Sequence, residues 1–118
     1  MNSILISVKK LLGLSEEDDS FDTDVMFHIN TVFSALTQMG IGPSNGFMIT
    51  GAETDWNDFI QDNTKIEMLK SYVYMRVKLM FDPPTNASVL ECQKELIKEL
   101  EWRLFTEFDL NKEASQNV

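Results

Sequence analysis

Residues 64–81 have the sequence TKIEMLKSYVYMRVKLMF, in which apolar side chains recur at the spacing of an α-helix. One stripe runs from Ile66 to Met80, and further apolar side chains make the C-terminal half of this helix apolar almost all round. Such a helix lies at the centre of a bundle or of an oligomer. We expect it to end before the run from Asp82 to Pro84, because proline disfavours helix in the preceding residue and lacks an N–H donor.

Similar periodicity predicts further helices at residues 3–12, 22–39, 55–61 and 86–108. Residues 40–54 break the pattern, because they contain four of the five glycines and one proline, and they predict a long loop. No run has convincing strand alternation. The sequence therefore predicts an all-α fold, a small helical bundle of four to five helices with one long loop.

The chain is long enough for one domain only. We expect residues 1–108 to form a single helical domain that needs no disulfide or metal to fold. Residues 109–118 are polar, and they are interpreted as a flexible C-terminal tail.

The net charge of -9 is concentrated in one segment of the chain. Residues 16–62 carry ten acidic and no basic side chains, residues 63–118 carry nine acidic and eight basic ones, and residues 1–15 carry two lysines. This distribution argues against a nucleic-acid site that neutralises phosphates. The acidic segment is interpreted either as ordinary solvated surface or as a surface that repels a polyanion or meets a basic partner.

No pattern of residues points to catalysis, a cofactor or a metal. The chain has no Gly-rich phosphate loop and no HExxH, CxxC or GxSxG motif. Its only histidine, His28, is far in sequence from its only cysteine, Cys92. The aspartates between Asp18 and Asp24 lack the glycine and terminal glutamate of a calcium loop. No apolar run approaches the ~20 residues that span a bilayer, so we expect neither an enzyme nor a membrane protein.

Several aromatic and apolar side chains exceed what one face of a thin bundle needs. Tyrosine and tryptophan are frequent anchors at protein interfaces, so these side chains are interpreted either as subunit contacts or as core. The candidates for subunit contacts are Tyr72, Tyr74, Met75, Leu79, Phe81 and Trp102.

Five runs of sequence, in this order and spacing, resemble a known family. They are FDTDVMFHIN (21–30), LTQMGIGP (36–43), WNDF (56–59), YVYMRVKLMFDPP (72–84) and ELEWR (99–103). Over roughly residues 10–105 the chain resembles the head–tail connector (adaptor) proteins of tailed bacteriophages and prophages of Gram-positive bacteria.

The resemblance implies a structural virion protein, made in the host bacterial cytoplasm, that assembles into a homo-oligomeric ring of about a dozen copies. The ring would dock beneath the portal protein at the capsid vertex and bind a stopper or tail-completion protein below. Genome DNA would pass through its channel without specific binding.

Two sets of site residues follow from that expectation. An acidic channel wall would repel DNA, and the candidates for it are Asp55, Asp58 and Asp62. The C-terminal end of the last helix and the tail are expected to dock on the portal, with the candidates Phe105, Phe108 and Leu110.

Two other functions compete with the connector. An acidic DNA mimic would inhibit a nucleic-acid-binding protein, although mimics usually distribute acidic residues along the whole molecule. A small enzyme or its regulatory subunit is the third interpretation, which the absent motifs disfavour.

Overall fold

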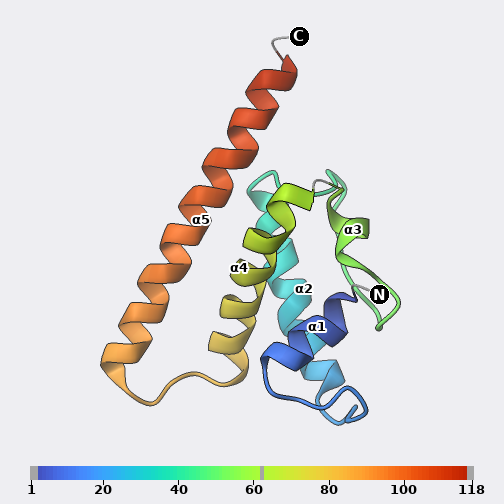
Figure 1. Ribbon diagram of the computed structural model, residues 1–118, viewed down its shortest axis with the longest axis vertical. Coiled ribbons are helices and arrows are strands. Elements are labelled where there is room, and N and C mark those ends of the chain that lie inside the picture. The colour runs from blue at the N-terminus through green and yellow to red at the C-terminus, as the bar shows by residue number, and fades with distance from the viewer. Residues whose placement is uncertain (1–2, 62, 117–118) are drawn as a thin grey trace.

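The structure, a computed structural model, describes residues 3–61 and 63–116, and the side chains of residues 3–61 and 64–108. Within these ranges the chain forms five α-helices and no strand, which confirms the predicted all-α fold. The helices are α1 (Ile4–Leu11), α2 (Asp22–Gln38), α3 (Trp56–Phe59), α4 (Asn63–Phe81) and α5 (Ala87–Gln116). α2 packs on α4, α4 packs on α5 and α1 packs on α2 (Figure 1). α4 is therefore the central helix, as its broad apolar surface predicts.

The ends of the helices follow local signals in the sequence. The Ser3 hydroxyl accepts a hydrogen bond from the Ile6 N–H at 3.3 Å at the start of α1, and Gly13, with φ +83°, follows its end. The side-chain oxygen of Asn86 accepts hydrogen bonds from the N–H groups of Ser88 and Val89, at 2.8 and 3.2 Å, at the start of α5. Asn86 thus caps α5.

The predicted end of the last helix, at residue 108, was wrong. The backbone of α5 is helical to Gln116, eight residues farther along the chain. Polar composition does not stop a helix, and no glycine or proline follows Pro84 to stop this one. The division into a domain of residues 1–108 and a flexible tail stays a prediction.

The predicted loop at residues 40–54 contains no helix or strand, and it is attached to the bundle at two buried isoleucines, Ile41 and Ile49. The side-chain amide of Asn30 donates to the Ile49 carbonyl at 3.0 Å and accepts from the Ile49 N–H at 2.7 Å. Both backbone groups of a buried residue are satisfied in this way, so α2 holds the middle of the loop.

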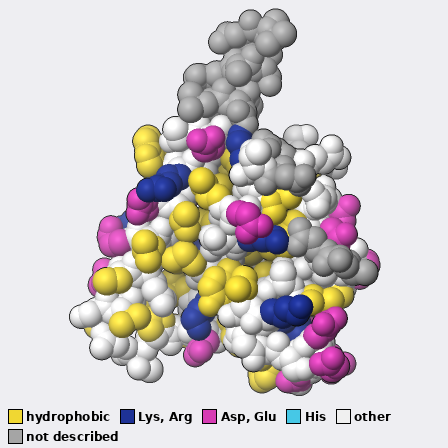
Figure 2. Space-filling view, viewed as in Figure 1, with side chains coloured by type: hydrophobic (Ala, Val, Ile, Leu, Met, Phe, Trp, Pro, Cys, Tyr) yellow, Lys and Arg dark blue, Asp and Glu magenta, His cyan; other side chains and the backbone are white. Residues whose placement is uncertain are grey.

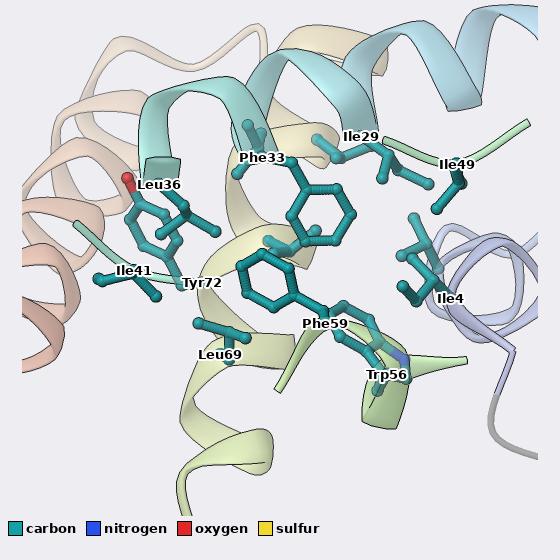
Figure 3. Packing of buried hydrophobic residues seen from close by; sticks show 14 of the residues in the cluster. Ile4, Ile29, Phe33, Leu36, Ile41, Ile49, Trp56, Phe59, Leu69 and Tyr72 are labelled. Atoms are coloured by element: carbon teal, nitrogen blue, oxygen red, sulfur yellow. The ribbon is translucent and has the colours of Figure 1, made fainter. Parts of the chain in front are cut away.

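Aromatic rings from three segments form the centre of the core. Phe33 of α2 lies with its ring centroid 4.6 Å from that of Phe59, 5.1 Å from that of Phe47 and 6.3 Å from that of Trp56. Figure 3 shows Phe33 and Phe59 facing each other, with Trp56 beside them. The indole N–H of Trp56 donates to the Ser7 hydroxyl at 2.8 Å, so burial of Trp56 leaves its only polar group satisfied.

A buried lysine fixes the acidic loop between α1 and α2. The Lys9 ammonium lies 2.8 Å from an Asp22 carboxylate oxygen and donates to the Glu16 carbonyl at 3.1 Å. A buried ammonium group is stable only when it is paired and hydrogen-bonded. Lys9 therefore ties the end of α1, the acidic loop and the first turn of α2 to one another.

Candidate assembly surfaces

A polar contact joins α4 to α5. The Tyr72 hydroxyl donates to a Glu101 carboxylate oxygen at 2.7 Å and accepts from the Arg76 guanidinium at 2.9 Å. Burial raises the pKa of Tyr72, so the hydroxyl stays protonated as the donor to Glu101. This contact holds α5 near the middle of its length.

The same contact corrects one predicted site residue. Tyr72 was predicted as a candidate subunit contact, but its side chain is fully buried within the chain. The ring is part of the core, and α5 covers the hydroxyl. Tyr72 is therefore not available to a neighbouring subunit.

We expect Tyr72→Phe to lower the free energy of unfolding by about 1–2 kcal/mol, because Glu101 and Arg76 lose a shared partner in a half-buried site. Denaturant unfolding measures this change. The matched control is Tyr74→Phe, since Tyr74 makes no side-chain hydrogen bond to the described residues. Equal destabilisation by the two substitutions would contradict the role given to the Tyr72 hydroxyl.

The other candidates for subunit contacts remain accessible. Trp102 on α5 is 67% exposed, whereas four candidates on α4 are partly buried, namely Tyr74, Met75, Leu79 and Phe81. Their role as subunit contacts stays a prediction.

A groove crosses the outer face of α4 between α1 and α5, and we call it the α4 groove. It consists of two cavities of about 600 and 230 Å³ that share Tyr74 and Met75 as lining residues. Leu11 of α1 and Leu96 of α5 extend its apolar lining. Its basic side chains are Lys10, Lys70 and Lys78. Figure 2 shows hydrophobic side chains across the centre of this face, interspersed with Lys and Arg.

The outer face of α2 is a second accessible surface, and its exposed side chains after the first turn of the helix are uncharged. Phe27 is 68% exposed, and at about 100° per residue it lies about 180° around the helix from the buried Leu36. Polar uncharged side chains continue the same face, and together with Phe27 they make up what we call the α2 outer strip: Phe27, Thr31, Ser34 and Gln38. Asp24, exposed one turn earlier, adds a negative charge at its N-terminal end.

Sequence reasoning did not single out Phe27 as a surface residue. The apolar stripe of α2 was predicted, and a position opposite that stripe indicates an exposed side chain, so the stripe could have identified Phe27. Met48, which is also largely exposed, lies in the 40–54 loop, where no periodicity marks a side chain as inside or outside.

Two of the three candidates for the acidic channel wall, Asp55 and Asp58, lie at the start of α3. The Asp55 N–H donates to a side-chain oxygen of Asp58 at 2.8 Å, so the Asp58 carboxylate helps to start α3. Asp58 is exposed and Asp55 is half-buried, while Asp62 lies outside the described residues. Their orientation toward a channel stays a prediction.

The most exposed acidic segment is the loop between α1 and α2. Hydrogen bonds from Ser15 and Ser20 hold the pKa values of Glu17 and Asp18 below their usual range. These two carboxylates therefore stay ionised to lower pH than free ones. Figure 2 shows acidic side chains gathered at the lower right of the molecule, at the α1–α2 end of the bundle.

The portal-docking candidates lie near the C-terminal end of α5. Phe105 is exposed, and Phe108 is half-buried with the Lys65 ammonium 4.8 Å from its ring centroid. The side chain of Leu110 lies outside the described ones. Docking on a portal stays a prediction for all three.

Among the residues that the structure describes, no group of three or more His, Cys, Asp or Glu side chains is arranged to hold a metal ion. Within the same ranges no helix has the length and apolar character required to span a bilayer.

Comparison with protein-family models gives one informative match. The model described as "Phage connector protein" matches residues 4–111, which include α1 to α4 and most of α5. No curated protein and no solved structure matches the chain significantly.

Proposed function

The chain belongs to the phage connector protein family, and from that membership we propose that it assembles into a ring between the portal protein and a stopper or tail-completion protein. A connector is a structural component of the phage virion, and in this role the ring is a passive conduit for genome DNA. The observation that carries the proposal is the family match, which spans residues 4–111 and so nearly the whole chain.

The distribution of charge supports the conduit. A passive channel must not bind phosphate groups, and carboxylates along its wall or mouth repel DNA. The chain concentrates ten acidic side chains in residues 16–62, whereas residues 63–118 are nearly balanced. The family match does not favour the alternative of an acidic DNA mimic.

Co-expression with the portal protein of the same phage tests the proposed assembly. We expect the two proteins to co-purify, and electron microscopy to show a ring of this chain bound to the portal ring. A chain that neither binds the portal nor forms a ring in its presence would contradict the proposal.

The channel assignment predicts an effect of removing charge at two acidic candidates. We expect Asp58→Asn combined with Asp62→Asn to slow DNA exit from assembled particles while the ring still forms. Asparagine keeps the oxygen that accepts from the Asp55 N–H, so α3 keeps its start. In a ring of about a dozen copies, the change removes about two dozen negative charges.

The matched control removes as many charges elsewhere, with Glu91→Gln and Glu95→Gln on the exposed face of α5. The readout is the rate of DNA release from triggered particles. Equal rates in the Asp58/Asp62 variant and the unmodified protein would contradict the channel assignment, as would equal slowing in the control.

A further inference from the structure

The α4 groove combines apolar side chains with an excess of lysines over carboxylates. In a protein of net charge -9, the side chains lining it include three lysines and one glutamate. Lys10 is exposed and forms no ion pair with the described residues. The Lys70 ammonium lies 3.8 Å from Glu67 within the groove, and the Lys78 ammonium lies 3.9 Å from a largely exposed Asp82. A groove lined by apolar side chains and by more lysines than carboxylates favours a partner segment that is apolar and negative.

The start of α2 has the complementary chemistry. Phe27 presents an exposed aromatic ring, and Asp24 adds an exposed carboxylate one turn away on the same face. The loop before α2 adds exposed carboxylates from Glu16 to Asp19, and Lys9 anchors that loop. An aromatic side chain beside carboxylates is what the α4 groove would accept.

The two surfaces point in opposite directions. The buried faces of α2 and α4 pack against each other, and Phe27 lies opposite the buried face of α2. Ser71 and Met75, in the α4 groove, lie about 160° around α4 from the buried Val73. Phe27 therefore cannot reach the groove of its own chain, and only another molecule can bring the two surfaces together.

Two different surfaces on opposite sides of a subunit produce head-to-tail contacts, which close into a ring when the rotation between neighbours allows it. For a ring of about a dozen copies the two contact surfaces of a subunit face about 150° apart, close to the opposed arrangement of the α2 outer strip and the α4 groove.

We propose that neighbouring copies of this chain meet head-to-tail, with Phe27 and the acidic start of α2 of one copy bound in the α4 groove of the next. This inference rests on the proposed ring and names the surfaces that build it.

Cysteine cross-linking tests the contact without altering its central side chains. In a Cys92→Ser background, Thr31→Cys places a thiol on the α2 outer strip and Ser71→Cys places one in the α4 groove; both positions are exposed. With a short bismaleimide at high protein concentration, we expect the double variant to give a ladder of dimers, trimers and larger species. An equal mixture of the two single variants is expected to give dimers only.

Four comparisons test whether the cross-link is specific. Thr31→Cys with Ser88→Cys, at the exposed start of α5, reports random collision. Phe27→Ala in the double variant is expected to lower the cross-linked yield by about five- to thirtyfold, as for an interface anchor. Lys10→Glu is expected to lower it by about two- to fivefold, and high salt is expected to act in the same direction.

Each contrary outcome overturns the proposal. A ladder no stronger than that of the Thr31/Ser88 pair would show that these surfaces do not meet. Dimers from either single variant alone would show a symmetric contact instead, and an unchanged yield with Phe27→Ala would remove the anchor. If, with the portal protein added, the thiol introduced by Ser71→Cys cross-links to the portal rather than to a second copy, the groove belongs to that partner, and the proposed function stands without this contact.

Discussion

Phe33→Ala is expected to lower the free energy of unfolding by about 3–5 kcal/mol, the cost of truncating a large buried aromatic side chain. Phe33 is fully buried, and its ring contacts three other aromatic rings from the 40–54 loop and the α3 segment. The substitution removes both this apolar burial and the contacts that hold the loop and α3 on α2. Small domains have a stability of roughly 5–15 kcal/mol, so the loss is a large share of the total.

Denaturant or thermal unfolding measures this change. Phe27→Ala is the matched control, because it removes the same ring from the same helix at a position that is 68% exposed. We expect that control to change stability by less than about 0.5 kcal/mol. Comparable losses in the two variants would show that the aromatic cluster does not form the core.

Gly42→Ala is the second substitution with a large expected effect, and we expect it to lower the free energy of unfolding by about 2–5 kcal/mol. Gly42 has φ +90°, a conformation that costs an L-residue about 1–2 kcal/mol. A methyl group at this position would also collide with the ring of Phe59. That ring is held between Phe33 and Phe47, so relief requires movement of the core, at a cost of about 1–3 kcal/mol.

Gly46→Ala separates the two contributions to this loss. Gly46 has a similar φ of +95°, but apart from its two chain neighbours an added methyl group would meet no atom of the described residues within 4 Å. We therefore expect Gly46→Ala to cost only the conformational part, about 1–2 kcal/mol. Thermal unfolding of both variants gives the comparison, and equal losses would mean that the collision with Phe59 is absent.

Periodicity was sufficient to predict the helices and the central position of α4. The apolar residues of α4 cover most of its circumference, and α2 and α5 both pack against this helix. The same periodicity did not show that Tyr72 is fully buried whereas Tyr74 and Met75, on the same helix, are partly accessible. An apolar position on a central helix does not by itself show whether another helix of the same chain or a second subunit covers it.

Local sequence patterns do not predict contacts between residues that lie far apart in the chain. The Asn30 side chain binds the backbone of Ile49 nineteen residues away, and an asparagine in a helix carries no sign of such a partner. The continuation of α5 was missed for a different reason. Polar composition favours a frayed end, but polar residues of good helix propensity continue a helix where no glycine or proline interrupts it.

The contact between Tyr72 and Glu101 lies at the midpoint of α5. Glu101 is the fifteenth of the thirty residues of this helix, so roughly 22 Å of helix extends on each side of it. A rigid tilt of α5 by about 10° about Glu101 would move each end of the helix by about 4 Å, in opposite directions. Because the buried side chains of Ile97 and Leu104 hold α5 on both sides of Glu101, such a tilt would break core contacts at both positions.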